Sequence, residues 1–393
     1  MNVLVLNGGS SSTKFSVFVV EVEGGEPHLL LDGELTKIGQ KQATLVMSTP
    51  AQASHQKLVE GTEAPEGAVA AVLDAVADAA VGKVDAVGYR IVHPGPRIHD
   101  HVQITHEVLK ELDAAATFAP LHDPGAMTMV RETMRRMPDV PHVACFDTVF
   151  HGTMPEEATV YAIPGNLRAL GLKRYGFHGL SCESALRQMR RLGSLPPRMV
   201  IAHLGSGCSV TAVQDGLSLD TTMGLTPTGG VVMGTRPGDV DPGLLLYLVR
   251  QQDATANTVE QMLNHHAGMV ALTGLPNDMK AVRVAASNGN AAALLALKVF
   301  TRSVCKAIGS FAWLLGGLDA IVFTGGIGEH DAATRAEILQ GTDASLDHFL
   351  SQTQDAEARR ISDSNSKTAV FVVTAQEDLV IALHVKRIVS VNA

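Results

Sequence analysis

The stretch MNVLVLNGGSSSTKFSVFVV (residues 1–20) decides the fold. It reads as an apolar strand over residues 3–6, a Gly/Ser loop over 7–12 and a second strand over 15–20, which together make a β-hairpin with a wide polar tip. The pattern returns half a chain later in MVIAHLGSGCSVTAV (residues 199–213). Two strand–loop–strand units at this spacing indicate an internal duplication, and a chance likeness of two Gly/Ser loops is the alternative.

Strands and helices alternate along the rest of the chain. The apolar patterns predict helices over 66–80, 124–137, 242–250 and 290–315, and strands over 84–92, 318–323 and 370–373. This alternation indicates an α/β fold, and two such halves would leave a cleft between them. The polar segment 354–367 is expected at the surface.

The composition excludes several classes of protein. The chain has 393 residues, which favours two domains, and its 46% hydrophobic content rules out wholesale disorder. The formal net charge is -9 and no Lys/Arg run occurs, so we expect no nucleic-acid partner. No apolar stretch approaches a membrane span of ~20 residues, and the four Cys form no CxxC pair. We therefore expect a cytoplasmic protein without a leader or membrane anchor, and interpret His99-Asp100-His101 as a solvated loop rather than a metal site.

Three Gly-rich segments are candidates for holding phosphate. The first loop offers Ser12 and Lys14 beside its glycines, the second spans residues 203–209, and the third, 325–329, follows a strand and precedes a helix. Small side chains let backbone N–H groups approach phosphate closely. A plain hairpin turn is the alternative for the first, and no Walker A pattern occurs. Together the three loops favour a nucleotide site.

Two arginines and two acids lie beside turns or strand ends. Arg90 ends a strand, and Arg236 lies in a Gly-rich turn; guanidinium groups match carboxylate and phosphate oxygens, although surface ion pairing is the alternative. Asp147 and Glu377 follow apolar strands, where α/β clefts open. Both acids are candidates for metal binding or for orienting another group, with helix capping as the alternative.

Two histidines are candidates for contact with a transferred group. His122 lies in APLHDP (residues 119–124), and His178 is followed by Gly179 in RYGFHG (residues 174–179). An imidazole next to glycine can point into a cleft, whereas a packed core histidine is the alternative.

Seven segments, in order, resemble the acetate kinase family of the acetate and sugar kinase, chaperone ATPase and actin superfamily. The resemblance runs nearly end to end. The segments are NGGSSSTK (7–14), RIVH (90–93), APLH (119–122), FDTVFH (146–151), RYGFHG (174–179), MGTR with GD (233–236 and 238–239) and FTGGIGE (323–329).

The resemblance implies two duplicated actin-like (ribonuclease H-like) domains. The N-terminal domain would span 1–147, completed by a helix over 380–393, and the nucleotide-binding domain would span 148–379. The resemblance also implies a homodimer that uses ATP/ADP with Mg²⁺, Mn²⁺ being the other candidate metal.

The resemblance further implies roles for residues. Asn7 and Glu377 would lie near the metal, and the catalytic residues would be Arg90, His122, Asp147, His178 and Arg236. Arg90 would also contact the substrate, whose methyl group would lie among Val92, Leu121, Phe177 and Pro227. The nucleotide would contact Ser12, Lys14, His203, Leu204, Gly205, Ser206, Gly207, Asp278, Met279, Lys280, Gly325, Gly326, Ile327 and Gly328.

The chain departs from the family pattern at its periphery. Ser206 stands where the family usually has Asn, which weakens one expected hydrogen bond to phosphate. Where the family usually has Ser-Asp-x-Arg, this chain has Asn277-Asp278-Met279-Lys280. The Lys ammonium group cannot stack on a ring or make paired hydrogen bonds as the Arg guanidinium group does. Asp123 replaces a usual Asn. We expect altered nucleotide or acyl preference.

The function expected from the sequence is reversible transfer of the ATP γ-phosphoryl group to acetate. The alternatives are a propionate or butyrate kinase, a non-catalytic nucleotide-binding regulator, and an actin-like or sugar-kinase ATPase. The apolar Val92, Phe177 and Pro227 fit a methyl group better than a polyol.

Overall fold

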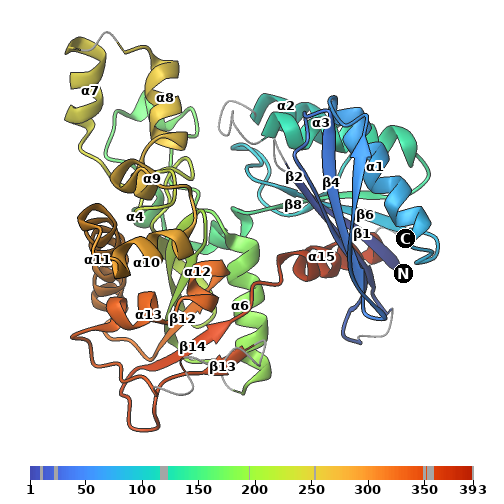
Figure 1. Cartoon of the computed structure of the whole chain (residues 1–393). Helices are drawn as coiled ribbons and strands as arrows, with labels where there is room; N and C mark the ends of the chain where they lie inside the picture. The colour runs from blue at the N-terminus through green and yellow to red at the C-terminus, as the bar shows by residue number, and fades with distance from the viewer. Residues whose placement is uncertain are drawn as a thin grey trace. The chain divides into compact units, whose positions relative to one another are not determined.

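The computed structural model describes residues 1–8, 12–21, 25–115, 123–193, 195–251, 254–347, 351 and 358–391. They form two compact units (Figure 1). Unit 1 comprises Met1–Val149 with Gln376–Ala393, and unit 2 comprises Phe150–Ala375. Within the described ranges, no helix is both long and apolar enough to cross a bilayer.

Unit 1 is built on an eight-stranded sheet in the order β5-β4-β3-β2-β1-β6-β8-β7. The strands are β1 (Asn2–Gly8), β2 (Ser12–Val19), β3 (His28–Thr36), β4 (Gln42–Thr49), β5 (Gln52–Glu60), β6 (Ala86–Ile91), β7 (Val102–Gln103) and β8 (His142–Phe146). The helices are α1 (Pro65–Asp78), α2 (His106–Ala115), α3 (Asp123–Arg136) and α15 (Glu377–Val391). Alternating residues of β1 and β2, such as Leu4, Leu6 and Phe15, fill the core.

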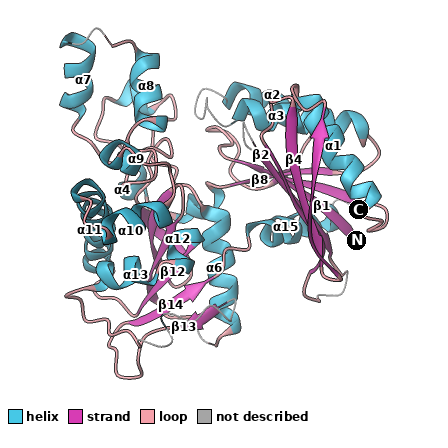
Figure 2. Ribbon diagram, in the orientation of Figure 1, coloured by secondary structure: helices cyan, strands magenta, loops and turns pink. Residues whose placement is uncertain are grey.

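Unit 2 is built on a six-stranded sheet in the order β11-β10-β9-β12-β14-β13. Figure 2 draws the strands in magenta and labels β12, β13 and β14. The strands are β9 (Arg198–Leu204), β10 (Cys208–Gln214), β11 (Leu217–Thr221), β12 (Ala320–Thr324), β13 (Ala358–Arg360) and β14 (Ala369–Val373). The longer helices are α6 (Gly179–Arg191), α7 (Pro242–Gln251), α8 (Ala256–His265), α10 (Met279–Ser287), α11 (Ala291–Leu314) and α13 (Ala332–Leu339). The shorter ones are η1 (Val149–Thr153, at the unit boundary), α4 (Glu156–Thr159), α5 (Gly165–Arg168), α9 (Gly268–Thr273) and α12 (Gly325–His330).

The two sheets share one topology. In unit 1, β3-β2-β1 is an antiparallel meander and β1, β6 and β8 run parallel. In unit 2, β11-β10-β9 repeats the meander and β9, β12 and β14 repeat the parallel set. The predicted α/β fold of two duplicated actin-like domains is therefore confirmed.

Side-chain caps explain where several helices of unit 2 begin. Asn290 accepts a hydrogen bond from the Ala293 N–H at the start of α11, and Thr255, Asp278 and Asp331 cap α8, α10 and α13 in the same way. Each cap satisfies an N–H group that has no partner within the helix. The long helix predicted over 290–315 is therefore confirmed almost to the residue.

The C-terminal helix α15 packs against β1 and β6 of unit 1, far from it in sequence. A Cβ on Gly88 of β6 would lie 2.7 Å or less from the side chains of Ile381 and Val385. Only glycine therefore lets α15 approach the sheet this closely. This packing brings the first residues of α15 to the carboxyl ends of the strands.

Three local predictions are corrected by the structure. The third Gly-rich segment does not precede a helix but is itself the first turn of α12, which begins at Gly325. The segment 354–367 is not all at the surface, because β13 pairs with β14 and Ile361 is fully buried. His101 is likewise not in a solvated loop, because its Nδ1 accepts a hydrogen bond from the Phe146 N–H and its ring lies 4.1 Å from that of His384.

Burial of His93 predicts a loss of stability at mildly acid pH. The side chain is fully buried, its Nδ1 accepts a hydrogen bond from the Gly95 N–H at 2.8 Å, and burial lowers its pKa to about 4. In the unfolded chain the imidazole takes up a proton near its ordinary pKa of about 6.5. The contribution of neutral, buried His93 to the free energy of unfolding is thus complete above about pH 6.5 and declines as pH falls toward 4. We expect it to lower the free energy of unfolding by about 2 kcal/mol between pH 7.5 and 5.

Urea denaturation across this pH range checks the prediction, with His93→Gln as the matched variant that cannot take up the proton. The variant should show the shallower decline. Parallel pH profiles for the two proteins would contradict the assignment to His93.

Candidate active site

The carboxyl ends of parallel strands bring Asn7, Arg90 and Asp147 together in unit 1. Leu6 lies opposite Tyr89 and Ile91 lies opposite Phe146, so Asn7 is beside Arg90 and Asp147 comes just after β8. Arg90 Nε and Nη2 donate to the two carboxylate oxygens of Asp147 at 3.0 and 2.6 Å, and Nη1 donates to Asn7 Oδ1 at 3.2 Å. This paired contact fixes the plane of the guanidinium group.

Helix α15 adds two acids to the same cluster. Glu377 Oε2 lies 3.6 Å from Arg90 Nε, and the Asp378 carboxylate accepts a hydrogen bond from Ser16 Oγ at 2.8 Å. Burial raises the pKa of Glu377 to about 7; Arg90 opposes this rise, while Asp147 and Asp378 add to it. Burial also raises the pKa of Asp378. Burial would lower the pKa of Arg90, but Asp147 and Glu377 outweigh it and hold that pKa above its usual value.

The charges of this cluster fit a hard cation. Asp147, Glu377 and Asp378 interact with Arg90, and the exposed Lys14 is a more distant positive charge. Carboxylates thus outnumber the cations, and Asp147 and Asp378 add to the rise in the pKa of Glu377 that burial causes. A divalent ion with oxygen ligands would relieve this excess, and the donors present, an amide oxygen and carboxylates, suit Mg²⁺.

His178 is held at the start of α6 in unit 2. It adopts the left-handed conformation with φ of 61°, which is uncommon for a residue with a side chain. Its Nδ1 lies 3.0 Å from Ser209 Oγ, and its ring stacks on that of His203 at 4.1 Å. His203 and Ser209 are cross-strand neighbours in β9 and β10, and His203 Nδ1 bonds Ser181 Oγ of α6 at 2.7 Å. The imidazole is thus oriented by the hairpin below it.

Arg236 and His178 converge on the loop between β9 and β10. A Cβ on Gly207 would lie 3.3 Å from His178 Nε2 and 3.7 Å from Arg236 Nη1, so both side chains lie against this glycine. Arg236 Nη1 donates to the Pro227 carbonyl at 3.0 Å, and burial lowers the pKa of Arg236, opposed by Cys208. Unit 2 therefore places a guanidinium group and an imidazole beside a Gly-rich turn.

Other predicted nucleotide-binding residues of unit 2 lie nearby, at the end of a strand or the start of a helix. Leu204 ends β9 and Gly205 opens the turn, with its N–H donating to the Gly207 carbonyl at 3.0 Å. Gly325 begins α12 at φ of 76°, and a Cβ there would lie 2.8 Å from the Leu204 carbonyl oxygen. Backbone packing thus puts the start of α12, which contains Gly326, Ile327 and Gly328, beside the turn. Asp278 precedes α10, whose first residues are Met279 and Lys280.

The residues predicted for a methyl pocket are divided between the units. Val92 follows β6 in unit 1, while Phe177 and Pro227 belong to unit 2. Phe177 is buried, and its carbonyl accepts a hydrogen bond from His151 Nε2 at 2.9 Å. Leu121 and His122 lie outside the described residues, as does the side chain of Asp123.

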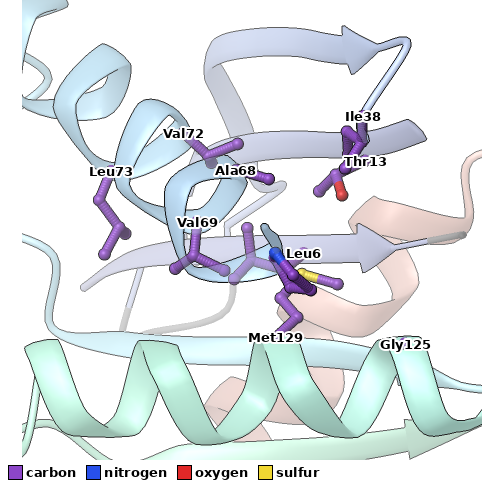
Figure 3. A pocket seen from close by; sticks show the side chains of 10 residues that line it. Leu6, Thr13, Ile38, Ala68, Val69, Val72, Leu73, Gly125 and Met129 are labelled. Carbon is purple, nitrogen blue, oxygen red and sulfur yellow. The ribbon is translucent and has the colours of Figure 1, made fainter. Parts of the chain in front are cut away.

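A small apolar cavity of about 70 Å³ lies within unit 1 beside β1, α1 and α3 (Figure 3). Its walls include Leu6, Val69 and Met129, with Thr13 as a hydroxyl at its edge. None of the described methyl-pocket candidates lines it. The cavity is therefore distinct from the predicted acyl site.

Sequence reasoning missed several side chains of these clusters. Asp378, Ser16, Ser181 and Ser209 are not among the site residues that the sequence predicts. The period-two pattern of β2 and β10 offered a signal for Ser16 and Ser209, because a polar residue within an apolar strand often has a buried partner.

These two sheets and their clusters define an α/β protein of the actin-like class. The chain belongs to the acetokinase family, whose model matches residues 2–383. It is 37% identical to an acetate kinase of Geobacillus kaustophilus over 98% of each chain, and 38% identical to one of Clavibacter michiganensis over 97% of each.

Solved structures agree with the sequence relatives. A crystal structure of Porphyromonas gingivalis acetate kinase has a TM-score of 0.88 and 32% identity, covering 99% of both chains. A propionate kinase from Francisella tularensis has a TM-score of 0.90 and 34% identity, covering 98% of this chain and 99% of that one.

Proposed function

We propose that this kinase transfers the γ-phosphoryl group of ATP to acetate, forming acetyl phosphate and ADP, and that the reaction is reversible. The convergence of Arg236 and His178 on Gly207 carries the proposal, because it offers positive charge and a hydrogen-bond donor beside a turn suited to phosphate. Family membership and the named acetate kinases support the same reaction.

The transfer proceeds directly and in line. The acetate carboxylate is already ionised at neutral pH, so it needs no general base. Catalysis is then positioning together with stabilisation of the charge on the equatorial phosphoryl oxygens. Arg90, Arg236 and His178 supply that stabilisation, Asp147 holds Arg90 in its plane, and His122 assists.

The metal is Mg²⁺, or Mn²⁺ in its place, held by Asn7 and Glu377. Magnesium keeps several waters and needs few protein ligands, so two donors are enough. When bound, it neutralises charge on the nucleotide's phosphates. The excess of carboxylates around Arg90 supports this assignment.

The nucleotide contacts both Gly/Ser hairpins and the starts of two helices. Ser12 and Lys14 of β2 serve the phosphates from unit 1. In unit 2 the contacts are His203, Leu204, Gly205, Ser206, Gly207, Asp278, Met279, Lys280, Gly325, Gly326, Ile327 and Gly328. We assign the two units as the catalytic domains of one enzyme.

ATP synthesis from acetyl phosphate and ADP, followed by luciferase, tests the reaction in its reverse direction. We expect ATP to form with Mg²⁺, to stop with EDTA and to resume with excess Mg²⁺ or Mn²⁺. ATP synthesis that is unaffected by chelation would remove the metal from the proposal, and no synthesis at all would overturn the function.

Val92 forms part of the acyl pocket with Leu121, Phe177 and Pro227. Val92→Ala should enlarge the pocket and raise the propionate-to-acetate ratio of kcat/KM. A pocket methylene is worth ~1–3 kcal/mol, so the ratio should change by about 10-fold or somewhat more. Kinetics with both acids measure the ratio, with Val81→Ala as a control outside the proposed site. An unchanged ratio would remove Val92 from the pocket wall.

A propionate kinase is the second candidate. The Francisella tularensis propionate kinase supports it, with its TM-score of 0.90. The kcat/KM values for acetate, propionate and butyrate on the unmodified protein decide between the two assignments.

We further propose a cytoplasmic homodimer that pairs through α11. Trp313 is 88% exposed, and Leu295 lies 18 residues earlier, five turns along the same face. Large exposed apolar side chains of this kind are typical of association surfaces.

Trp313→Glu should shift the mass in solution from about twice the chain's 41.4 kDa to a single chain. A charge buried in an interface without a partner is costly, so the dissociation constant should rise about 100-fold or more. Light scattering after size exclusion measures the mass, with Leu58→Glu on β5 as the control. A dimer that survives Trp313→Glu would exclude this face.

A further inference from the structure

Ser206 and Asn277 form a single unit although 71 positions separate them. Asn277 Nδ2 donates a hydrogen bond to Ser206 Oγ at 2.8 Å, across the gap between the β9–β10 turn and the segment before α10. Both residues are exposed, so the bond lies at the surface of unit 2. We propose that Asn277 is a positioning residue that orients the Ser206 hydroxyl to donate to a phosphate oxygen of the nucleotide.

Three segments meet at this bond. The Gly234 N–H donates to the Ser206 carbonyl at 3.2 Å, and a Cβ on Gly234 would lie 2.0 Å from Asn277 Oδ1. The Asn277 side-chain amide therefore lies directly against Gly234, two residues before Arg236. The contact joins the Gly-rich turn, the segment that carries Arg236 and the start of α10.

The direction of the hydrogen bond decides what Ser206 can do. A serine hydroxyl has one proton to donate and two lone pairs that can accept. Because Ser206 Oγ accepts from the Asn277 amide, its own proton stays available for an outside acceptor. An accepted bond also polarises the hydroxyl and strengthens its donation. A negatively charged phosphate oxygen is the acceptor that gains most from such a donor.

The location favours a phosphate over the base of the nucleotide. Ser206 directly precedes Gly207, against which His178 Nε2 and Arg236 Nη1 both lie. The Ser206 hydroxyl therefore belongs to the same turn as the glycine that the Arg236 guanidinium group approaches.

The same contact explains two of the departures from the family pattern. The resemblance leads us to expect Asn at position 206 and Ser at position 277, and this chain has the two residue types exchanged. Because the two exchanged side chains are hydrogen-bonded to each other, Asn277 brings to the turn, from the segment before α10, the amide group that position 206 lacks. The two departures are one compensated change rather than two losses.

The inference rests on the proposed function, since it requires the site to bind a nucleotide. Calorimetric titration with Mg-ADP and with adenosine provides the test. Asn277→Ser should weaken Mg-ADP binding about 3- to 10-fold, because two short hydroxyls do not span the gap. The double variant Asn277→Ser with Ser206→Asn should regain the affinity for Mg-ADP, because it again has one Asn and one Ser in contact, at exchanged positions.

Further measurements separate positioning from a merely structural role. Adenosine affinity and the melting temperature should be unchanged in all these variants, and the KM for ATP should rise more than kcat falls. Ser206→Ala should weaken Mg-ADP binding as much as Asn277→Ala does, and the double alanine variant should be no weaker than either. Ser287→Ala, which removes another exposed hydroxyl of α10, is the matched control.

Additive losses in the double alanine variant, or no rescue by the exchanged pair, would overturn the inference while leaving the kinase assignment standing. An equal loss of adenosine affinity would also overturn it, because the contact would then serve the base. A wild-type protein that binds no Mg-ADP would instead refute the proposed function, and the inference with it.

Discussion

Arg236→Ala is expected to lower kcat by about 10²–10³ while the KM for ATP changes only a few-fold. The guanidinium group is mostly buried, and its Nη1 lies against Gly207, the glycine that His178 Nε2 also approaches. A buried donor aimed at developing charge acts mainly in the transition state, and removal of one such donor typically costs this factor. A loss confined to kcat identifies an interaction made in the transition state.

Steady-state kinetics with ATP and acetate varied independently measure the effects on kcat and on the KM for ATP separately. Arg236→Lys should recover only part of the rate, because the Lys ammonium group keeps the positive charge but cannot make the paired hydrogen bonds of a guanidinium group. Arg168→Ala, on the exposed face of α5, is the control for loss of an arginine alone. A near-normal kcat in Arg236→Ala would remove Arg236 from the reacting centre.

Arg90→Met is expected to affect both activity and stability. The Asp147 carboxylate is almost fully buried and makes two hydrogen bonds to Arg90. Removal of the cation leaves this acid beside Glu377 and Asp378. Breaking one partner of a buried ion pair destabilises a protein by about 3–5 kcal/mol. We expect that loss in unfolding by urea, together with a fall in kcat of about 10²–10³.

A paired substitution separates the two roles of Arg90. Arg90→Met with Asp147→Leu removes both charges, so much of the stability should return while the activity stays lost. If activity recovers together with stability, Arg90 is only a structural residue. If neither recovers, the ion pair does not explain the destabilisation.

The fold was largely predictable from local patterns. The hairpin over residues 1–20 and its repeat over 199–213 both have their strands where alternation and Gly/Ser loops place them. The packing of α15 on unit 1 was not readable in this way, because it depends on Gly88 meeting side chains almost 300 positions later. The first turn of α12 was also missed, because a run of glycines has low helix propensity and tertiary packing, including that of Gly325 against Leu204, holds the turn.

The candidate site was predictable where strand ends define it. Asn7 and Arg90 lie near the carboxyl ends of parallel strands and Asp147 directly follows one, and such ends meet at one edge of a sheet. The contacts that orient these side chains cannot be predicted from local sequence patterns, because each joins two distant segments through a single pair of side chains. The bond between Asn277 and Ser206 is an example: each residue looked like an isolated departure until the structure showed the pair.

The most direct test of the account is to trap the product. The protein is incubated with Mg-ATP and acetate, propionate or butyrate in the presence of hydroxylamine, and the acyl hydroxamate is measured against the ADP formed. The account predicts acetohydroxamate in equal amount to ADP, with acetate giving the highest kcat/KM and Arg236→Ala giving almost none. ADP released without any trapped acyl group, or no reaction with any of the three acids, would contradict it.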